Sequence, residues 1–269
     1  LDGTLSRDGE LNPDSVARAI GKENKAEFAV PSLVEMRPPA LCEGCGHRDM
    51  YTVLTEVLRE EYPSHKVFSD IGCYTLGANA PFNAINSCVD MGASITMAKG
   101  ASDAGVHPAV AVIGDSTFAH SGITSLLGTI YNGGTGTLCI LDNRTTAMTG
   151  TQGNPVNGVT LTDSGHGVGP LDTPTGKALD LPALLSAMGV EDVAEVDAQD
   201  LQAVRSALKA AVAATDRLSV IVFKAPCRLV DRSRGKLPTI RDCRACGQCL
   251  KIGCPALGRA KDGTAAIDP

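Results

Sequence analysis

Residues 109–143, AVAVIGDSTFAHSGITSLLGTIYNGGTGTLCILDN, contain two apolar runs that each lead into an aspartate. The runs are residues 109–115 and 137–143, and unbroken apolar character of this length is typical of strands buried on both faces of a sheet. Between them, residues 122–131 predict a helix. A strand, a helix and a second strand over this length form one βαβ unit, so we expect the two strands to be parallel neighbours.

The same alternation of strand and helix continues on both sides of this unit. Further strands are expected at 67–70, 190–196 and 218–225, and further helices at 49–61, 93–104 and 200–214, the last with Asp197 as its N-cap. This order predicts an α/β fold over residues 36–226, with a mostly parallel sheet flanked by helices.

Two shorter segments differ in composition from this α/β region. Residues 1–35 predict a linker from a missing N-terminal region, with a short helix at 12–20 that Asn12 caps. Residues 227–269 are rich in Arg, Gly, Pro and Cys and predict the start of a second, small module. Because the sequence does not begin with Met and stops just after a cysteine motif, we expect a fragment of a longer chain.

Composition and charge narrow the classes of function. Hydrophobic residues make up 43% and charged residues 20%, which suits a globular chain with a packed core. The net charge of −6 argues against a nucleic-acid partner, and no apolar run is long enough to predict a membrane span. Ten cysteines without a secretory signal favour metal or redox chemistry in the cytoplasm over disulfides.

Asp115 and Asn143 follow the two strands of the central unit and are expected at the carboxyl edge of the sheet, where open α/β sheets bind ligands. Their side-chain oxygens suit Mg²⁺, and backbone N–H groups near Ser116 and Thr117 suit a phosphate. The alternative is structural: an aspartate that caps a helix and an asparagine in a turn.

Cysteines are expected at the same edge. Cys42 and Cys45 form a C-x-x-C pair, whereas Cys73 and Cys227 each follow a predicted strand. A C-x-x-C pair alone is compatible with a zinc site, a redox pair or an iron–sulfur cluster. Two other cysteines, Cys88 and Cys139, stand in apolar surroundings and are expected in the core.

A second cysteine motif lies near the end of the sequence. Cys243, Cys246 and Cys249 are separated by two residues each, and Cys254 follows after four and precedes Pro255. The spacing resembles half of a bacterial ferredoxin motif, in which the first three cysteines bind one 4Fe–4S cluster and the fourth binds another. It predicts a truncated ferredoxin-like module, with a zinc ribbon as the alternative.

Four stretches together resemble a known family. They are RPPALCEGCGHRDM (37–50), DIGCYTLG (70–77), GDSTFAHSGITSLL (114–127) and LDNRTTAMTGTQ (141–152). They closely resemble the α subunits of the indolepyruvate:ferredoxin oxidoreductases, which belong to the 2-oxoacid:ferredoxin oxidoreductases. Gly-Asp-Ser with a downstream Asp-Asn is similar to the thiamine diphosphate motif, although Ser116 replaces the usual glycine.

The resemblance implies roles for the residues already singled out. Asp115, Asn143 and the backbone carbonyl of Thr145 would bind Mg²⁺, and Gly114, Ser116 and Thr117 would contact the diphosphate. Four cysteines would bind a proximal 4Fe–4S cluster, with Cys73 beside the thiamine cofactor: Cys42, Cys45, Cys73 and Cys227. Apart from the resemblance, His47, His120 and His166 are candidates to approach a 2-oxoacid substrate, and no residue is assigned a catalytic role.

The activity implied is oxidative decarboxylation of aryl 2-oxoacids to acyl-CoA, with electrons passing through 4Fe–4S clusters to ferredoxin. The implied partners are a β subunit, ferredoxin, CoA and the 2-oxoacid. The glutamate that activates thiamine would lie on another domain, so the chain alone should be inactive. Two rival functions stay open: a non-oxidative thiamine-dependent decarboxylase or synthase, and an electron-transfer module on an α/β scaffold.

Overall fold

The computed structural model describes residues 4–5, 12–22, 33–34, 39–160, 174–231, 233 and 239–267, in two units that divide between residues 39 and 40. In the first unit, helix α1 (Pro13–Ala19) begins after Asn12, whose side-chain oxygen accepts a hydrogen bond from the Ser15 amide at 2.9 Å. An asparagine cap followed by proline at the first helical position favours this helix, as predicted.

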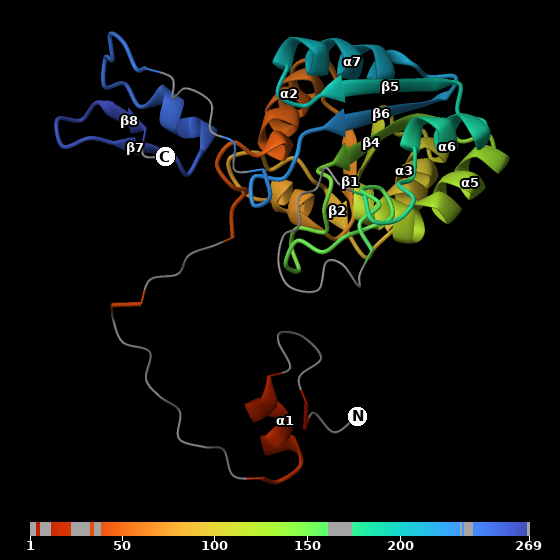
Figure 1. Ribbon diagram of the computed structural model, residues 1–269, viewed down its shortest axis with the longest axis horizontal. Helices are drawn as coiled ribbons and strands as arrows, with labels where there is room; N and C mark the ends of the chain where they lie inside the picture. Colours follow the sequence, from red (N-terminus) through yellow and green to blue (C-terminus); the bar gives the residue numbers. More distant parts are fainter. Residues whose placement is uncertain are drawn as a thin grey trace. The chain divides into compact units, whose positions relative to one another are not determined.

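The second unit is built around a six-stranded sheet in which every strand pair is parallel (Figure 1). Its strand order is β2-β1-β3-β4-β6-β5. The strands are β1 (Lys66–Ser69), β2 (Ser87–Cys88), β3 (Ala109–Gly114), β4 (Gly136–Asp142), β5 (Asp192–Asp197) and β6 (Leu218–Lys224). Gly114 of β3 pairs with Leu141 of β4, so the predicted central pair is confirmed and Asp115 and Asp142 follow at one edge.

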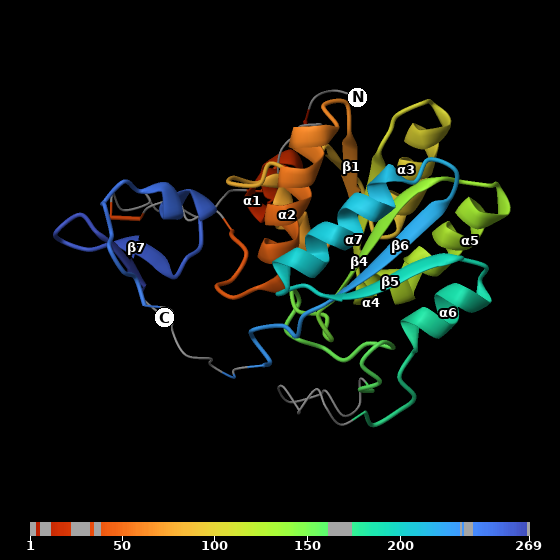
Figure 2. The ribbon, with the colours of Figure 1, turned by 90° about the horizontal axis from the view of Figure 1, so that it is seen from above.

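Helices cover both faces of this sheet (Figure 2). Helices α2 (Gly46–Glu61) and α7 (Leu201–Ala213) pack on one face, and α3 (Ala93–Asp103), α5 (Ile123–Tyr131) and α6 (Leu181–Ala187) on the other. Successive residues of β3 enter opposite cores: Val110 and Val112 join one, Ala111 and Ile113 the other. Burial on both faces explains why the central strands are apolar throughout.

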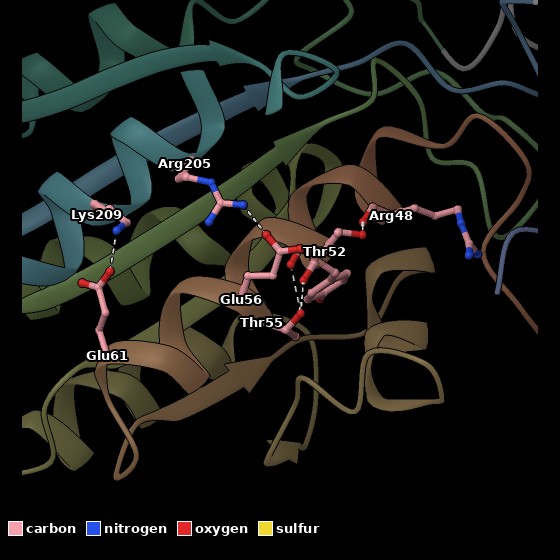
Figure 3. A network of polar contacts seen from close by, with 8 residues as sticks. Arg48, Thr52, Thr55, Glu56, Glu61, Arg205 and Lys209 are labelled. Atoms are coloured by element: carbon pink, nitrogen blue, oxygen red, sulfur yellow. Dashed lines mark hydrogen bonds and ion pairs between the residues drawn. The ribbon is translucent and has the colours of Figure 1, made fainter. Parts of the chain in front are cut away.

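Helices α2 and α7 are also joined at the surface. Glu56 pairs with Arg205, and Glu61 pairs with Lys209, each pair linking α2 to α7 (Figure 3). Exposed pairs of this kind contribute roughly 1 kcal/mol or less each, so the buried apolar face carries most of the packing energy.

The structure corrects three local predictions. The helix after β3 begins at Asp115 (α4, Asp115–Thr117) and reaches α5 through a π-helical turn at Phe118–Gly122, whereas it was expected to start at residue 122. Helix α7 is capped by Asp200 rather than Asp197, because the Asp200 carboxylate accepts from the amides of Gln202 and Ala203. Cys88 is partly exposed, since it lies on the short strand β2 at the edge of the sheet, whereas Cys139 is buried as predicted.

The C-terminal segment contains a short 3₁₀ helix, η3 (Gln248–Ile252), and an antiparallel pair, β7 (Leu257–Arg259) and β8 (Ala265–Ile267). Arg48 of α2 donates a hydrogen bond to the Ile252 carbonyl at 2.6 Å, which ties this segment to the α/β region. In the part of the chain that the structure describes, no helix is long and apolar enough to cross a membrane.

Candidate active site at the carboxyl edge of the sheet

A cavity opens where β3 and β4 end. It is lined by all six residues predicted to hold Mg²⁺ and a diphosphate: Gly114, Asp115, Ser116, Thr117, Asn143 and Thr145. Since Ser116 and Thr117 stand in the first turn of the helix that follows β3, their N–H groups are among those that lack an intrahelical acceptor. The edge therefore combines oxygen ligands with N–H donors, as a metal-bound diphosphate requires.

Asp115 is the buried carboxylate of this cavity, with 2% of its surface exposed. One carboxylate oxygen accepts a hydrogen bond from the side-chain amide of Asn154 at 3.2 Å. Burial raises the pKa of Asp115 to about 7, and the neighbouring Asp142 adds to the rise. A cation in the cavity would favour the ionised carboxylate, so the position is suited to metal binding.

The loop after β4 is held in a fixed shape by side-chain hydrogen bonds. Asn143 accepts from the Thr145 amide at 3.1 Å, and the Thr145 hydroxyl donates to the Gln152 carbonyl at 3.1 Å. The hydroxyls of Ser116 and Thr146 lie 2.8 Å apart and join this loop to the helix after β3. These hydrogen bonds join the two halves of the site to each other.

Gly114 has no side chain, and the ring of Tyr74 occupies the space beside it. A Cβ atom at this position would lie 2.5 Å from Cε1 of Tyr74, closer than real contacts allow. The Tyr74 hydroxyl donates to the Ile71 carbonyl at 3.0 Å, which holds the ring in place beside the cavity. Glycine is therefore required here by close approach.

A second cavity adjoins the first and is lined by the four cysteines predicted to converge: Cys42, Cys45, Cys73 and Cys227. They come from the start of α2, the turn after β1 and the segment after β6. Cys73, Asn143 and Ala147 line both cavities. The thiols therefore gather directly beside the candidate metal and diphosphate site.

Gly46 allows Cys42 and Cys45 to lie close to Cys227. It is the first residue of α2, and a methyl group there would overlap the methyl group of Ala225, just after β6. The Cys227 amide in turn donates to the Asn143 carbonyl at 3.0 Å. Close approach of α2 to the end of β6 thus brings segments far apart in sequence to one point.

The four thiols resist ionisation in the absence of a metal. Burial raises the pKa of Cys73 to about 11, and Cys227, Cys45 and Cys42 add to the rise because like charges would crowd together. Burial also raises the pKa of the other three thiols. Among the described residues, no group of three or more His, Cys, Asp or Glu side chains is arranged to hold a metal ion.

His47 lines the cysteine cavity and is 6% exposed. Burial lowers its pKa to about 4, and the Asp115 carboxylate opposes this shift. Its ring packs edge-on against Tyr74, with the centroids 6.3 Å apart. Of the other two histidines expected near a substrate, His120 is exposed and lines a separate cavity with Ser116 and Asn154, and His166 lies outside the described residues.

The C-terminal cysteines form tight turns near the surface. The Cys243 sulfur accepts a hydrogen bond from the Ala265 amide at 3.3 Å, which lowers the pKa of Cys243. Asp242, Ala245, Gly247 and Gly253 all have positive φ. Cys243 and Cys246 are exposed, and Cys249 and Cys254 are partly buried.

Asn154 and Tyr74 are among the site residues that were not predicted from the sequence. Asn154 contacts Asp115, and Tyr74 packs over Gly114. The Asn-Pro-Val-Asn stretch at 154–157 does signal a turn, because asparagine side chains bond to backbone amides nearby. No local signal places that turn against a strand end 39 residues away.

Comparison with known proteins agrees with this geometry. Residues 70–223 match the family model described as thiamine pyrophosphate enzyme, C-terminal TPP binding domain. The chain is 36% identical to indolepyruvate oxidoreductase subunit IorA of Methanothermobacter marburgensis, over all of this chain and 43% of that protein. It is 35% identical to the subunit of the same name from Archaeoglobus fulgidus, over 82% of this chain and 35% of that protein.

The similarity to indolepyruvate oxidoreductase subunits confirms the predicted resemblance, although the chain spans less than half the length of these curated relatives. Among solved structures, 2-oxoglutarate:ferredoxin oxidoreductase from Magnetococcus marinus superposes with a TM-score of 0.58 at 18% identity. The superposition covers 77% of this chain and 69% of that one and shows a shared fold. With the family model matching more than half of the sequence, from the end of β1 to the end of β6, the chain belongs to the thiamine pyrophosphate enzymes, of which it carries the C-terminal cofactor-binding domain.

Proposed function

We propose that this chain supplies the diphosphate-binding half of a thiamine-dependent 2-oxoacid:ferredoxin oxidoreductase that acts on aryl 2-oxoacids such as indolepyruvate. The observation that carries the proposal is the pair of adjoining cavities, one with Asp115 and Asn143 and one with four cysteines. A thiamine enzyme that needs no electron acceptor has no use for four thiols beside its cofactor. The curated relatives are named as indolepyruvate oxidoreductase subunits, which favours the aryl substrate.

The residues of the first cavity fit Mg²⁺ and a diphosphate. The side-chain oxygens of Asp115 and Asn143 and the carbonyl of Thr145 would bind the cation, which prefers hard oxygen ligands. The amides of Ser116 and Thr117, with the space left by Gly114, would receive the diphosphate. When bound, thiamine diphosphate supplies the electron sink that decarboxylation of a 2-oxoacid needs.

The residues of the second cavity fit a 4Fe–4S cluster by their chemistry. A cubane cluster needs four thiolates, each on a different iron, and four cysteines line this one cavity. When bound, the cluster accepts electrons one at a time.

The C-terminal cysteines would extend this path as the start of a ferredoxin-like 4Fe–4S module. The positive-φ turns and the N–H group aimed at the Cys243 sulfur are features of loops that wrap a cluster. Cys243, Cys246 and Cys249 would bind one cluster, and Cys254 a second. Ferredoxin would receive the electrons, CoA the acyl group, and a β subunit would complete the enzyme in the cytoplasm.

The experiment is cofactor and iron analysis of the complete, anaerobically purified enzyme with three variants. Asp115→Ala should weaken thiamine diphosphate binding at least about tenfold, because the cation loses its charged ligand. Cys45→Ser should remove about four iron atoms, the content of one cluster. Cys88→Ser is the matched control, since Cys88 lines neither of these cavities, and should change neither quantity.

Two results would overturn the proposal. One is unchanged thiamine diphosphate affinity in Asp115→Ala. The other is 2-oxoacid decarboxylation by an iron-free enzyme with no electron acceptor, which would establish the non-oxidative function.

A further inference from the structure

His47 is a buried imidazole that the chain leaves without a partner. Neither Nδ1 nor Nε2 has a hydrogen-bond partner among the described residues, although the side chain is 94% shielded from solvent. A buried polar atom without a partner destabilises the folded chain, because it has given up its hydrogen bonds to water. An imidazole carries at least one N–H in either protonation state, so at least one of the unpaired atoms is a donor. The position therefore indicates an acceptor that is not part of this chain.

The surroundings of His47 limit where that acceptor can be. The ring lines the cavity formed by Cys42, Cys45, Cys73 and Cys227. On another side it meets the Tyr74 ring, whose hydroxyl already donates to the Ile71 carbonyl. Asp115 is near enough to act on the imidazole electrostatically, but no hydrogen bond joins the two side chains. His47 lines the cysteine cavity, so a group bound in that cavity is the candidate for the missing partner.

We propose that His47 donates a hydrogen bond to a sulfur atom of the cluster in the cysteine cavity and so raises its reduction potential. The inference rests on the proposed function, because it needs a cluster at that place. His47 is a positioning residue and not a ligand, since four cysteines already supply the four thiolates of a cubane. A bound cluster would accept and pass on one electron at a time, and His47 would keep its proton throughout.

The direction of the effect follows from charge. A reduced cluster carries one more negative charge than the oxidised one, and an N–H dipole aimed at sulfur stabilises that charge most where water is excluded. Loss of the donor should therefore make the potential more negative. A purely structural histidine would leave the potential in place.

The test is an EPR-monitored redox titration of the complete enzyme, following the signal that disappears in Cys45→Ser. His47→Leu and His47→Phe remove the donor, the second with a ring of similar width, and both should shift the midpoint potential to more negative values. His47→Asn and His47→Gln keep an N–H near one ring nitrogen or the other, and at least one should restore the potential toward the wild-type value. His65→Leu is the control, because His65 precedes β1 at the opposite end of the strand from the site.

Three outcomes separate the possibilities. An intact cluster with an unchanged potential in both donor-free variants overturns the role of His47 and leaves the proposed function standing. Weaker thiamine diphosphate binding with an unchanged potential would assign His47 to the diphosphate side, and also overturns it. If Cys45→Ser loses neither iron nor an EPR signal, the proposed cluster itself fails, and this inference with it.

Discussion

At the scale of single residues, Asp115 combines burial, which opposes charge, with a proposed role that needs charge. It is buried at the end of β3, yet under the proposed function it must be ionised to bind a cation. The Asn154 amide and the backbone amide at Ser116 reduce the cost of ionisation but do not remove it, and the pKa stays near 7. The Asp115 carboxyl therefore keeps its proton to a higher pH than an ordinary aspartate does.

This shift predicts an unusual pH dependence of stability. Between pH 3.8, the ordinary value, and about 7, the unfolded chain has ionised the carboxyl whereas the folded chain keeps its proton. The contribution of Asp115 to stability should therefore fall as pH rises through this window, by at most about 1.4 kcal/mol per pH unit. Urea unfolding of the wild-type chain and of Asp115→Asn in Mg²⁺-free buffer at pH 5, 6 and 7 measures this contribution as the difference between the two profiles, which also removes the opposite contribution of His47. Parallel profiles for the two chains would contradict the assignment.

At the scale of elements, the contact between α2 and the end of β6 positions the cysteines. Gly46→Ala should push α2 away from Ala225, because the added methyl group has no room. We expect a loss of about 1–3 kcal/mol in the free energy of unfolding, together with loss of iron from the cysteine cavity. Chemical denaturation and iron analysis measure the two effects.

The matched control is Gly100→Ala in α3, where an added Cβ meets nothing within 4 Å. It should raise stability by about 0.5–1 kcal/mol, because alanine favours a helix over glycine. Equal effects of the two substitutions would show that the space at Gly46 is not what matters.

The elements also show what the sequence can and cannot predict. The strands β3 and β4 were predictable because their apolar runs are continuous and end in polar residues. The helix start at Asp115 was not, because Ser116, Thr117 and Gly122 are weak helix formers and the π-helical turn leaves no local signature. The burial of His47 could not be predicted either, since it depends on Tyr74 and the cysteine segments, which meet α2 only in the folded chain.

At the scale of the whole molecule, the C-terminal segment is coupled to the α/β region through Arg48. The Arg48 guanidinium donates to the carbonyls of Leu41, just before the first cysteine pair, and of Ile252, just before Cys254. One side chain thus links the backbone at both cysteine motifs. Under the proposed function, this link would hold the two cysteine motifs near each other.

Loss of one C-terminal cysteine should abolish ferredoxin reduction without weakening the binding of thiamine diphosphate. In the complete enzyme, Cys249→Ser should lower the iron content by about four atoms and abolish ferredoxin reduction. Thiamine diphosphate affinity should stay unchanged, because Cys249 lines neither of the two cavities. Isothermal titration and ferredoxin reduction assays measure these effects. Full ferredoxin reduction by the variant would show that the C-terminal segment is not on the electron path.

Cys73 lines both cavities, and this shared wall has a practical consequence. An inhibitor that fills the thiamine cavity must press against a side chain that also borders the cysteine cavity. If the proposed cluster is bound there, its magnetic signature should change when the neighbouring cavity is filled. The protein would carry its own spectroscopic reporter, and compounds could be screened for cofactor-site binding by watching iron rather than by following turnover.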